Sequence, residues 1–231
     1  MNVSKTGSPA YTIAYIQLEQ NESVIAEPGS MVAMSSGIYV NPRMEGGVIK
    51  SFGRRLFGEE AFFFTKYSAT TGGSWVALSP VMPGDIYVTN INFGENLMAT
   101  SGSILAHGEE VISSIKIAGV KTMLMQEGLT AIELSGEGTV LLSTYGAAQE
   151  IIIEIGQELI IDTGHLLAWS PNLEIQVGPL AGIFGQAFTG EGLVAKFISH
   201  DSSGKVIIQT RAEQDFKDWI FPTRTQNIKQ K

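Results

Sequence analysis

Hydrophobic residues recur along the chain in short runs rather than at helical spacing. The runs are rich in Ile, Val, Phe and Tyr, and clusters of Gly, Pro, Asn and Ser separate them, which is the pattern of strands joined by turns. We expect strands in the windows 11–18, 61–67, 75–78, 85–91, 140–144, 151–155, 193–198 and 206–210. The pattern therefore predicts an all-β fold.

A short helix is predicted near the C-terminus, at 212–221. Phe216, Trp219 and Ile220 fall on one face of this segment, and the residues between them are mostly polar. Because an isolated helix this short is marginal in water, we expect it to dock on the β body and to bury Trp219. The alternative is a free amphipathic element that binds a membrane or a partner.

Two sequence blocks occur three times in the same order. The first block contains a marker glycine, which is Gly29, Gly102 or Gly164, and the second begins with a glutamate, which is Glu60, Glu127 or Glu191. In the first block the residues 24–25, 97–98 and 159–160 before the glycine correspond, as do the apolar triplets 31–33, 104–106 and 166–168 after it. This self-similarity predicts three tandem β repeats, at approximately 11–84, 85–147 and 148–211.

The repeats also lead to expectations about turns and about the overall arrangement. Each marker glycine is expected to take φ > 0 in a turn, where a side chain would clash. Three repeats can bury their apolar faces around a pseudo-threefold axis, in a closed arrangement that hides their edge strands. Nothing resembles a linker, so we expect residues 1–231 to form a single domain.

Composition narrows the classes of function. The chain of 231 residues has no cysteine and a formal net charge of −8. The absence of cysteine excludes disulfides and thiolate chemistry, and the acidic balance argues against nucleic-acid binding. No signal peptide or bilayer-spanning run is evident. We therefore expect a cytoplasmic protein that associates with membranes at most peripherally.

Three stretches carry a resemblance to a known family: AEPGSMVAMSSGIYV, FGRRLFGEEAFFFTKYSA and LIIDTGHLLAWSPNL. They resemble the bacterial family related to the mitochondrial-biogenesis Aim24 proteins, and the resemblance extends over about 11–222. It implies a fold classed with the tryptophan RNA-binding attenuation protein (TRAP-like), a double-stranded β-helix or β-sandwich type. It implies no established catalytic activity, and it links the mitochondrial relatives to inner-membrane organisation through protein complexes. Fold kinship alone does not imply RNA binding.

Candidate catalytic residues are few. His107, His165 and His200 occupy non-equivalent positions in the repeats and form no zinc-binding motif. Ser103, His165 and Asp162 supply the residue types of a Ser–His–Asp catalytic triad, but nothing in their spacing along the sequence favours one. We therefore assign no catalytic residue and no cofactor.

The three equivalent glutamates have two interpretations. Glu60, Glu127 and Glu191 either accept backbone N–H bonds in local turns or converge on the pseudo-axis to bind a cation. The first interpretation is favoured, since a glutamate beside a glycine at a strand start is common in turns.

Apolar loops precede these glutamates and contain the equivalent residues Phe57, Leu124 and Phe188. The loops either fold inward as core or expose an apolar patch for a partner or a second copy.

Two hypotheses for the function follow. The first is a non-enzymatic scaffold or interaction protein that assembles with itself or with protein partners. The second is a small-molecule or metal-binding β-barrel protein or enzyme, since double-stranded β-helix folds often enclose ligands.

Overall fold

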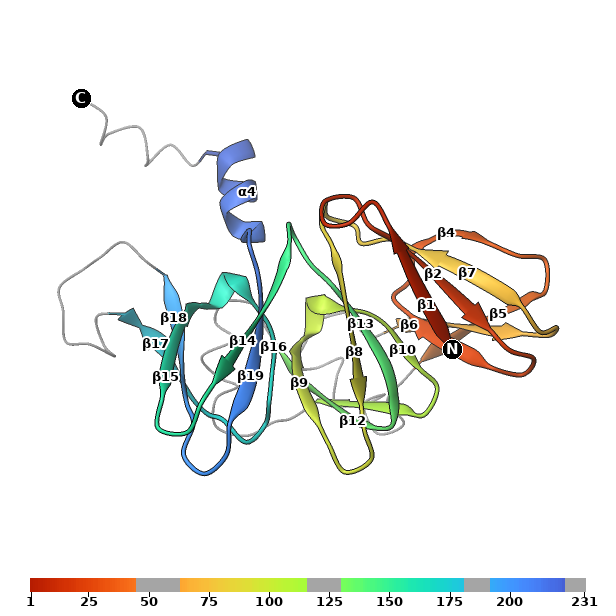
Figure 1. The fold of residues 1–231 in the computed structure, drawn as a ribbon. Coiled ribbons are helices and arrows are strands. Elements are labelled where there is room, and N and C mark those ends of the chain that lie inside the picture. The colour runs from red at the N-terminus through yellow and green to blue at the C-terminus, as the bar shows by residue number, and fades with distance from the viewer. Residues whose placement is uncertain (45–62, 116–129, 181–191, 223–231) are drawn as a thin grey trace.

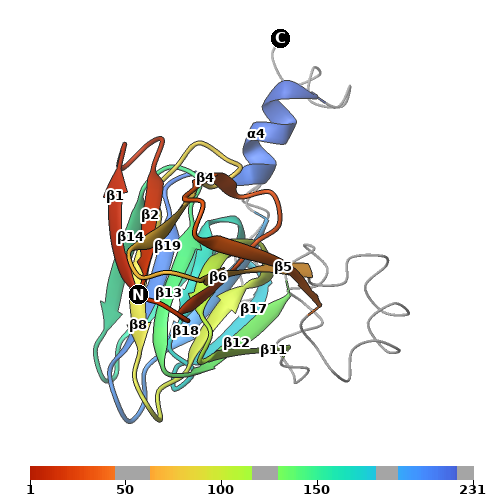
Figure 2. The ribbon, with the colours of Figure 1, turned by 90° about the vertical axis from the view of Figure 1, so that its right-hand side faces the viewer.

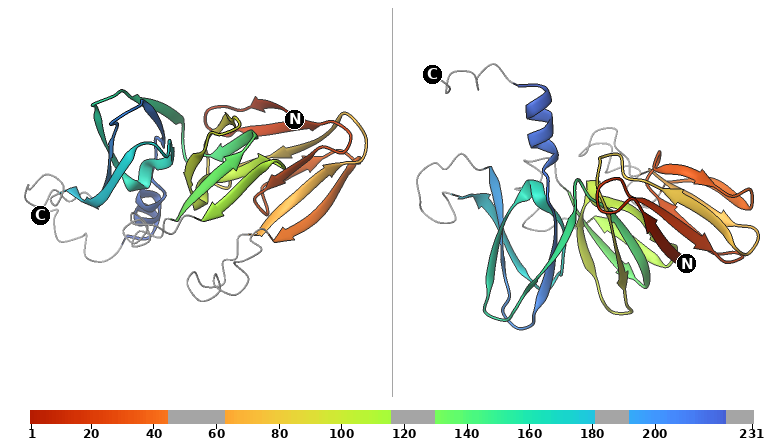
Figure 3. Two further views of the ribbon diagram at one scale, coloured as in Figure 1. Left: turned by 90° about the horizontal axis from the view of Figure 1, so that it is seen from below. Right: turned by 45° about the horizontal axis from the view of Figure 1, so that its top comes forward.

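The computed structural model of the protein describes residues 1–44, 63–115, 130–180 and 192–222. These residues are mostly in β-strands, with one short helix near the C-terminus, as the sequence predicts (Figure 1). The strands fall into three consecutive groups, which lie side by side in a row from the N-terminal end to the C-terminal end. Two further views in Figure 3 show the same row.

The first group contains β1 (Asn2–Thr6), β2 (Ile13–Leu18), β3 (Ser23–Ala26), β4 (Met31–Met34), β5 (Ile38–Met44), β6 (Phe63–Ala69) and β7 (Ser74–Leu78). The second contains β8 (Ile86–Ile91), β9 (Leu97–Thr100), the 3₁₀ turn η1 (Ser101–Ser103), β10 (Ile104–Gly108), β11 (Val111–Ile115), β12 (Ala131–Gly136) and β13 (Gly138–Ser143). The third contains β14 (Ala148–Ile153), β15 (Glu158–Asp162), the 3₁₀ turn η2 (Thr163–His165), β16 (Leu166–Trp169), β17 (Glu174–Pro179), β18 (Leu193–Ile198) and β19 (Gly204–Gln209). The helix α4 (Glu213–Ile220) follows.

One pairing scheme recurs in the three groups. One half of each group has the strand order β2-β7-β4, β8-β13-β10 or β14-β19-β16. The other half has the order β5-β6-β3, β11-β12-β9 or β17-β18-β15, and β1 adds an outer strand beside β2. The strand order therefore recurs in the three groups. Whether the sequence itself is a tandem repeat stays a prediction.

Antiparallel pairing joins each group to the next. β3 of the first group pairs with β10 of the second, and β9 of the second pairs with β16 of the third. Each junction fuses two three-stranded halves into a six-stranded sheet. Figure 2 looks along the row from the first group and shows the groups one behind another.

The described strands do not close into a ring. β4 and β15 are edge strands, and they lie at opposite ends of the row (Figure 1). The closed arrangement around a pseudo-threefold axis is therefore not found. Sequence similarity among units does not fix the angle between them, and here successive junctions extend the row instead of bending it back.

The hydrophobic core is shared across the junctions. Leu105 and Ala106 of β10 pack with the core of the first group, and Leu167 and Ala168 of β16 pack with that of the second. The junction strands thus fill the core of the neighbouring group as well as extending its sheet.

The marker glycines do not share one backbone conformation. Gly29 has φ +84°, as expected for a turn that follows a proline. Gly102 and Gly164 lie in the 3₁₀ turns η1 and η2, and neither has a positive φ. The prediction was therefore wrong for these two glycines, because a 3₁₀ turn keeps φ negative.

The C-terminal helix forms where it was predicted, but it does not bury Trp219. Phe216 is half-buried and contacts the ring of Tyr145, with 5.8 Å between ring centroids. The helix then extends away from the β body (Figure 1), and Trp219 stacks on Phe216 with 77% of its surface exposed. The predicted docking is corrected: only the first turn of the helix reaches the body, so one aromatic ring anchors it.

A partly buried carboxylate ties the first group to the second. Oδ1 of Asp85, just before β8, accepts hydrogen bonds from Lys5 Nζ (3.1 Å), Ser8 Oγ (2.9 Å) and Thr12 Oγ1 (2.9 Å), as well as from the N–H of Ile86 (2.8 Å). Desolvation raises the pKa of Asp85, but together these hydrogen bonds outweigh it and lower the pKa below its usual range. The ionised carboxylate therefore stabilises the fold.

We expect Asp85→Asn to lower the free energy of unfolding at pH 7 by about 1–3 kcal/mol, since hydrogen bonds to a charged acceptor are lost. Because the folded-state pKa is depressed, the contribution of Asp85 is present above the unfolded pKa of about 3.9 and is lost as pH falls through the folded pKa. Denaturant titrations should show that the difference in the free energy of unfolding between the variant and the natural protein becomes smaller as the pH is lowered from 7 to 3. Asp201→Asn, in an exposed loop, is the control. A difference that stays constant with pH would contradict this role of the charge.

We expect Trp219→Ala to change the free energy of unfolding by less than about 1 kcal/mol, because the ring is exposed. Trp169→Ala is the matched comparison, since Trp169 is 3% exposed and should cost about 3–5 kcal/mol. Denaturant unfolding of both variants measures the contrast. Equal losses would show that Trp219 is buried in solution.

Candidate functional site

The three histidines lie apart, and each has its own local partner. Nδ1 of His165 is 2.8 Å from the carbonyl oxygen of Gln209, and Nε2 of His200 is 2.7 Å from a carboxylate oxygen of Glu174. His107 is buried in β10, with Nδ1 2.8 Å from the carbonyl oxygen of Gly108. Within the described ranges, no three His, Asp or Glu side chains are placed to share a metal ion.

The residues considered for a catalytic triad, Ser103, Asp162 and His165, form hydrogen bonds to different groups. Ser103 donates to the carbonyl oxygens of Thr100 and Leu167, and Asp162 accepts from the N–H of Gly164. Each side chain therefore satisfies a backbone group in or beside the turns η1 and η2, and the three do not form a relay.

Both predicted sets of site residues lie outside the described residues. These are the candidate cation ligands Glu60, Glu127 and Glu191, and the candidate interaction residues Phe57, Leu124 and Phe188. Both sets stay predictions.

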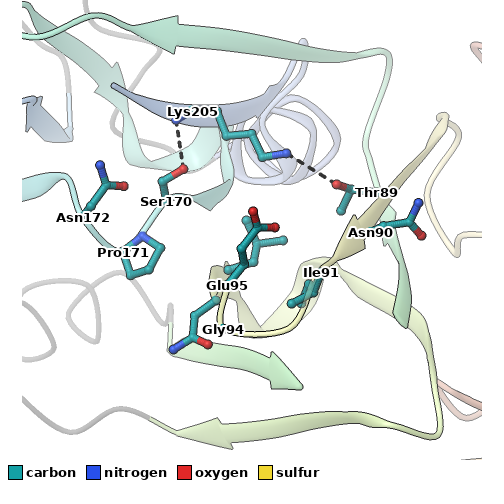
Figure 4. Close-up of a pocket in the computed structure, with 11 residues that line it drawn as sticks. Thr89, Asn90, Ile91, Gly94, Glu95, Ser170, Pro171, Asn172 and Lys205 are labelled. Carbon is teal, nitrogen blue, oxygen red and sulfur yellow. Dashed lines mark hydrogen bonds between the residues drawn. The ribbon is translucent and has the colours of Figure 1, made fainter. Parts of the chain in front are cut away.

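A cavity of about 420 Å³ lies between the β8–β9 turn and the turn after β16 (Figure 4). The carboxylate of Glu95 faces its centre, and Lys205 extends across one side, with Nζ 3.5 Å from Thr89 Oγ1. Ser170 Oγ accepts a hydrogen bond from the backbone N–H of Lys205 at 3.0 Å. The cavity can hydrogen-bond a small polar molecule, but its described lining has no histidine to activate Ser170 as a nucleophile.

The described sheets have eight edge strands, which are β1, β4, β5, β8, β11, β14, β15 and β17. The more informative ones are β4 and β15 at the two ends of the row, because all their counterparts in the other groups are paired on both sides. β4 pairs with β7 and has no other partner among the described strands, whereas the corresponding strands β10 and β16 are each paired on both sides. β15 likewise pairs only with β18 within the described ranges, whereas β3 and β9 have two partners each.

Exposure follows this difference in pairing. Val32 of β4 is 53% exposed, whereas its counterparts Leu105 and Leu167 are 0% and 3% exposed. The other residues of β4 follow the same trend, since Met31 and Met34 are exposed while all four residues of β16 are buried. β4 is thus an exposed apolar strand, whereas its counterparts β10 and β16 are buried against the neighbouring strands β3 and β9.

β15 shows the same contrast at the other end of the row. Ile160 is 36% exposed, whereas its counterpart Ile25 in β3 is 1% exposed. Glu158, at the start of the strand, forms an ion pair with Lys196 of β18 (2.8 Å). The strand therefore combines an apolar centre with a charged margin.

Sequence reasoning aligned these strands but did not identify the edges as a site. The sequence MVAM of β4 is as apolar as its counterparts, so nothing local distinguishes it. The lack of charge and proline, which natural sheets commonly place on exposed edges, is shared by all three strands and so does not single out β4.

The fold and its edges define an all-β protein of strand groups joined edge to edge. The family model described as "Mitochondrial biogenesis AIM24" matches residues 3–211, so the chain belongs to this family. The chain is similar to the uncharacterised protein M6_Spy0233 of Streptococcus pyogenes serotype M6, with 27% identity covering 90% of this chain and 85% of that protein. The crystal structure of the protein SPYM3_0169 from Streptococcus pyogenes has the same fold, with a TM-score of 0.73 and 24% identity, and the match covers 95% of this chain and 97% of that one.

No helix in the described part of the chain is both long enough and apolar enough to cross a membrane.

Proposed function

We propose that the protein is a non-enzymatic scaffold, which binds proteins by adding their strands to the sheet edges formed by β4 and β15. The observation that carries this proposal is the contrast between β4, with Val32 53% exposed, and the buried counterparts of that strand in β10 and β16. An edge strand offers a row of backbone donors and acceptors, and strand addition uses them for affinity while side chains give specificity.

The chemistry of the two edges fits this role. β4 has no charged residue and no proline, two features that commonly protect exposed edges. The exposed apolar residues of β4 would favour aggregation unless a partner covers them. Scaffolding explains why such edges are kept.

The family resemblance adds a cellular setting to the proposal. The mitochondrial relatives are linked to protein complexes of a membrane, so we place this scaffold in the cytoplasm beside membrane-associated complexes. Protein partners, or further copies of the chain, are the proposed ligands, and nucleic acid is not.

A photo-crosslinking amino acid at position 32 or 160 should yield discrete protein adducts in the cells that produce the protein, because bound strands lie directly against these edges. The matched control is position 81, where Val81 is 81% exposed between β7 and β8. Adducts are identified by mass spectrometry after irradiation.

The proposal predicts adducts at 32 and 160 and few or none at 81. The absence of adducts at both edges, or the same adducts at all three positions, would overturn it.

A further inference from the structure

We infer that the strand bound at each edge belongs to a second copy of this chain: β15 of one copy pairs antiparallel with β4 of the next. This inference rests on the proposed function, since it names the partner at the same two edges.

The chain contains two examples of the same contact. At the first junction a strand from the β3 position pairs with one from the β10 position, and at the second β9 pairs with β16 in the same manner. β15 holds the position of β3 and β9 in its group, and β4 holds that of β10 and β16. β15 and β4 therefore have the same positions as the two strands that pair at each internal junction, but each lacks its partner.

A bulge supports the correspondence of the three strands. The register against the neighbouring strand shifts between Met31 and Ala33 in β4, between Ile104 and Ala106 in β10, and between Leu166 and Ala168 in β16. The shift lies at the same place in all three strands.

The extra residue of the bulge takes part in the junction. At the first junction the carbonyl oxygen of Leu105 accepts a hydrogen bond from the N–H of Glu27 (2.8 Å), which follows β3. The counterparts of these two groups at the open edges are the carbonyl of Val32 and the N–H of Asp162.

The internal junctions also define the register. Ala106 lies opposite Ala26, and His107 opposite Ile25, at the first junction.

The second junction repeats the register, with Ala168 opposite Ala99 and Trp169 opposite Met98. The corresponding alignment between copies places Ala33 opposite Ile161 and Met34 opposite Ile160. Both intermolecular pairs are apolar, so the side chains are compatible with burial.

Geometry makes this contact intermolecular. β4 and β15 lie at opposite ends of the row (Figure 1), so one chain does not bring its own two edges together. A contact between two different surfaces is heterologous, and it generates a ring if the rotation closes or a filament if it does not. In either case each copy uses both edges.

Paired single cysteines test this contact directly, because the natural chain has no cysteine. Purified Met34→Cys and Ile160→Cys proteins, carrying tags of different mass, are mixed and oxidised. Opposite residues of an antiparallel pair lie about 4.5–5.5 Å apart at Cα, within the range that a disulfide spans. We expect a disulfide-linked heterodimer of the two tagged proteins, seen by non-reducing electrophoresis.

The control mixture replaces Ile160→Cys with Ile152→Cys, on the exposed face of β14 in the same group. We expect at least about tenfold less heterodimer from it, because only apposed thiols gain a high effective concentration. Homodimers of Met34→Cys as the main product would show that β4 pairs with itself, and equal heterodimer in both mixtures would show random collision. Either result overturns the inference.

A second measurement does not depend on the cysteine variants. Sedimentation of the natural chain should show species larger than the monomer that grow with concentration. Met34→Lys should weaken this association at least about tenfold, because it places a charge in an apolar junction. A natural chain that stays monomeric at all concentrations would overturn the inference.

The outcomes separate this inference from the proposed function. Photo-crosslinked adducts with other proteins alone, without self-adducts and without the 34–160 disulfide, would leave the scaffold proposal standing and refute the second copy as partner. No adducts at either edge would refute both.

Discussion

The structure depends on one constraint: the backbone N–H and C=O groups along a strand need partners, and a three-stranded half-sheet leaves one row of them open on each side. Within the chain the constraint is met twice, where β3 joins β10 and where β9 joins β16. The same two junctions fill the core, since Leu105 and Leu167 cross into neighbouring clusters. Hydrogen bonding and apolar burial therefore depend on the same contacts, and both are left incomplete at β4 and β15.

Each of the eight expected windows overlaps a strand, but the other eleven of the nineteen described strands were not predicted, and neither was the assembly of the strands. The expected windows 11–18, 85–91 and 193–198 contain β2, β8 and β18, because alternation of apolar residues and flanking turn residues are local signals. Closure around an axis was not found, because it depends on the angle at each junction, and no short segment encodes that angle. The turns at Gly102 and Gly164 differ from that at Gly29 for a more local reason, since Pro28 precedes only Gly29.

The candidate site was the less predictable part. Val32, Leu105 and Leu167 are equivalent and apolar, so the sequence predicts burial for all three, and only the missing neighbour leaves Val32 exposed. Whether a residue is buried depends on the presence of a neighbouring strand as well as on the residue itself. The C-terminal helix shows the same limitation: its apolar stripe was visible, but whether Trp219 meets a surface depends on the direction in which the helix leaves β19.

Several hydrogen-bonded polar side chains have structural roles. Asp85 neutralises Lys5 and orders the segment before β2, and the side chains of Ser103 and Asp162 satisfy backbone groups at the 3₁₀ turns. The cavity beside Lys205 has hydrogen-bonding groups without an activated nucleophile. By contrast, the exposure of Met31, Val32 and Met34 contributes nothing to an isolated chain and favours aggregation. Apolar residues at an uncharged sheet edge are consistent with burial in an assembly, and the chain's own junctions show what geometry such burial takes.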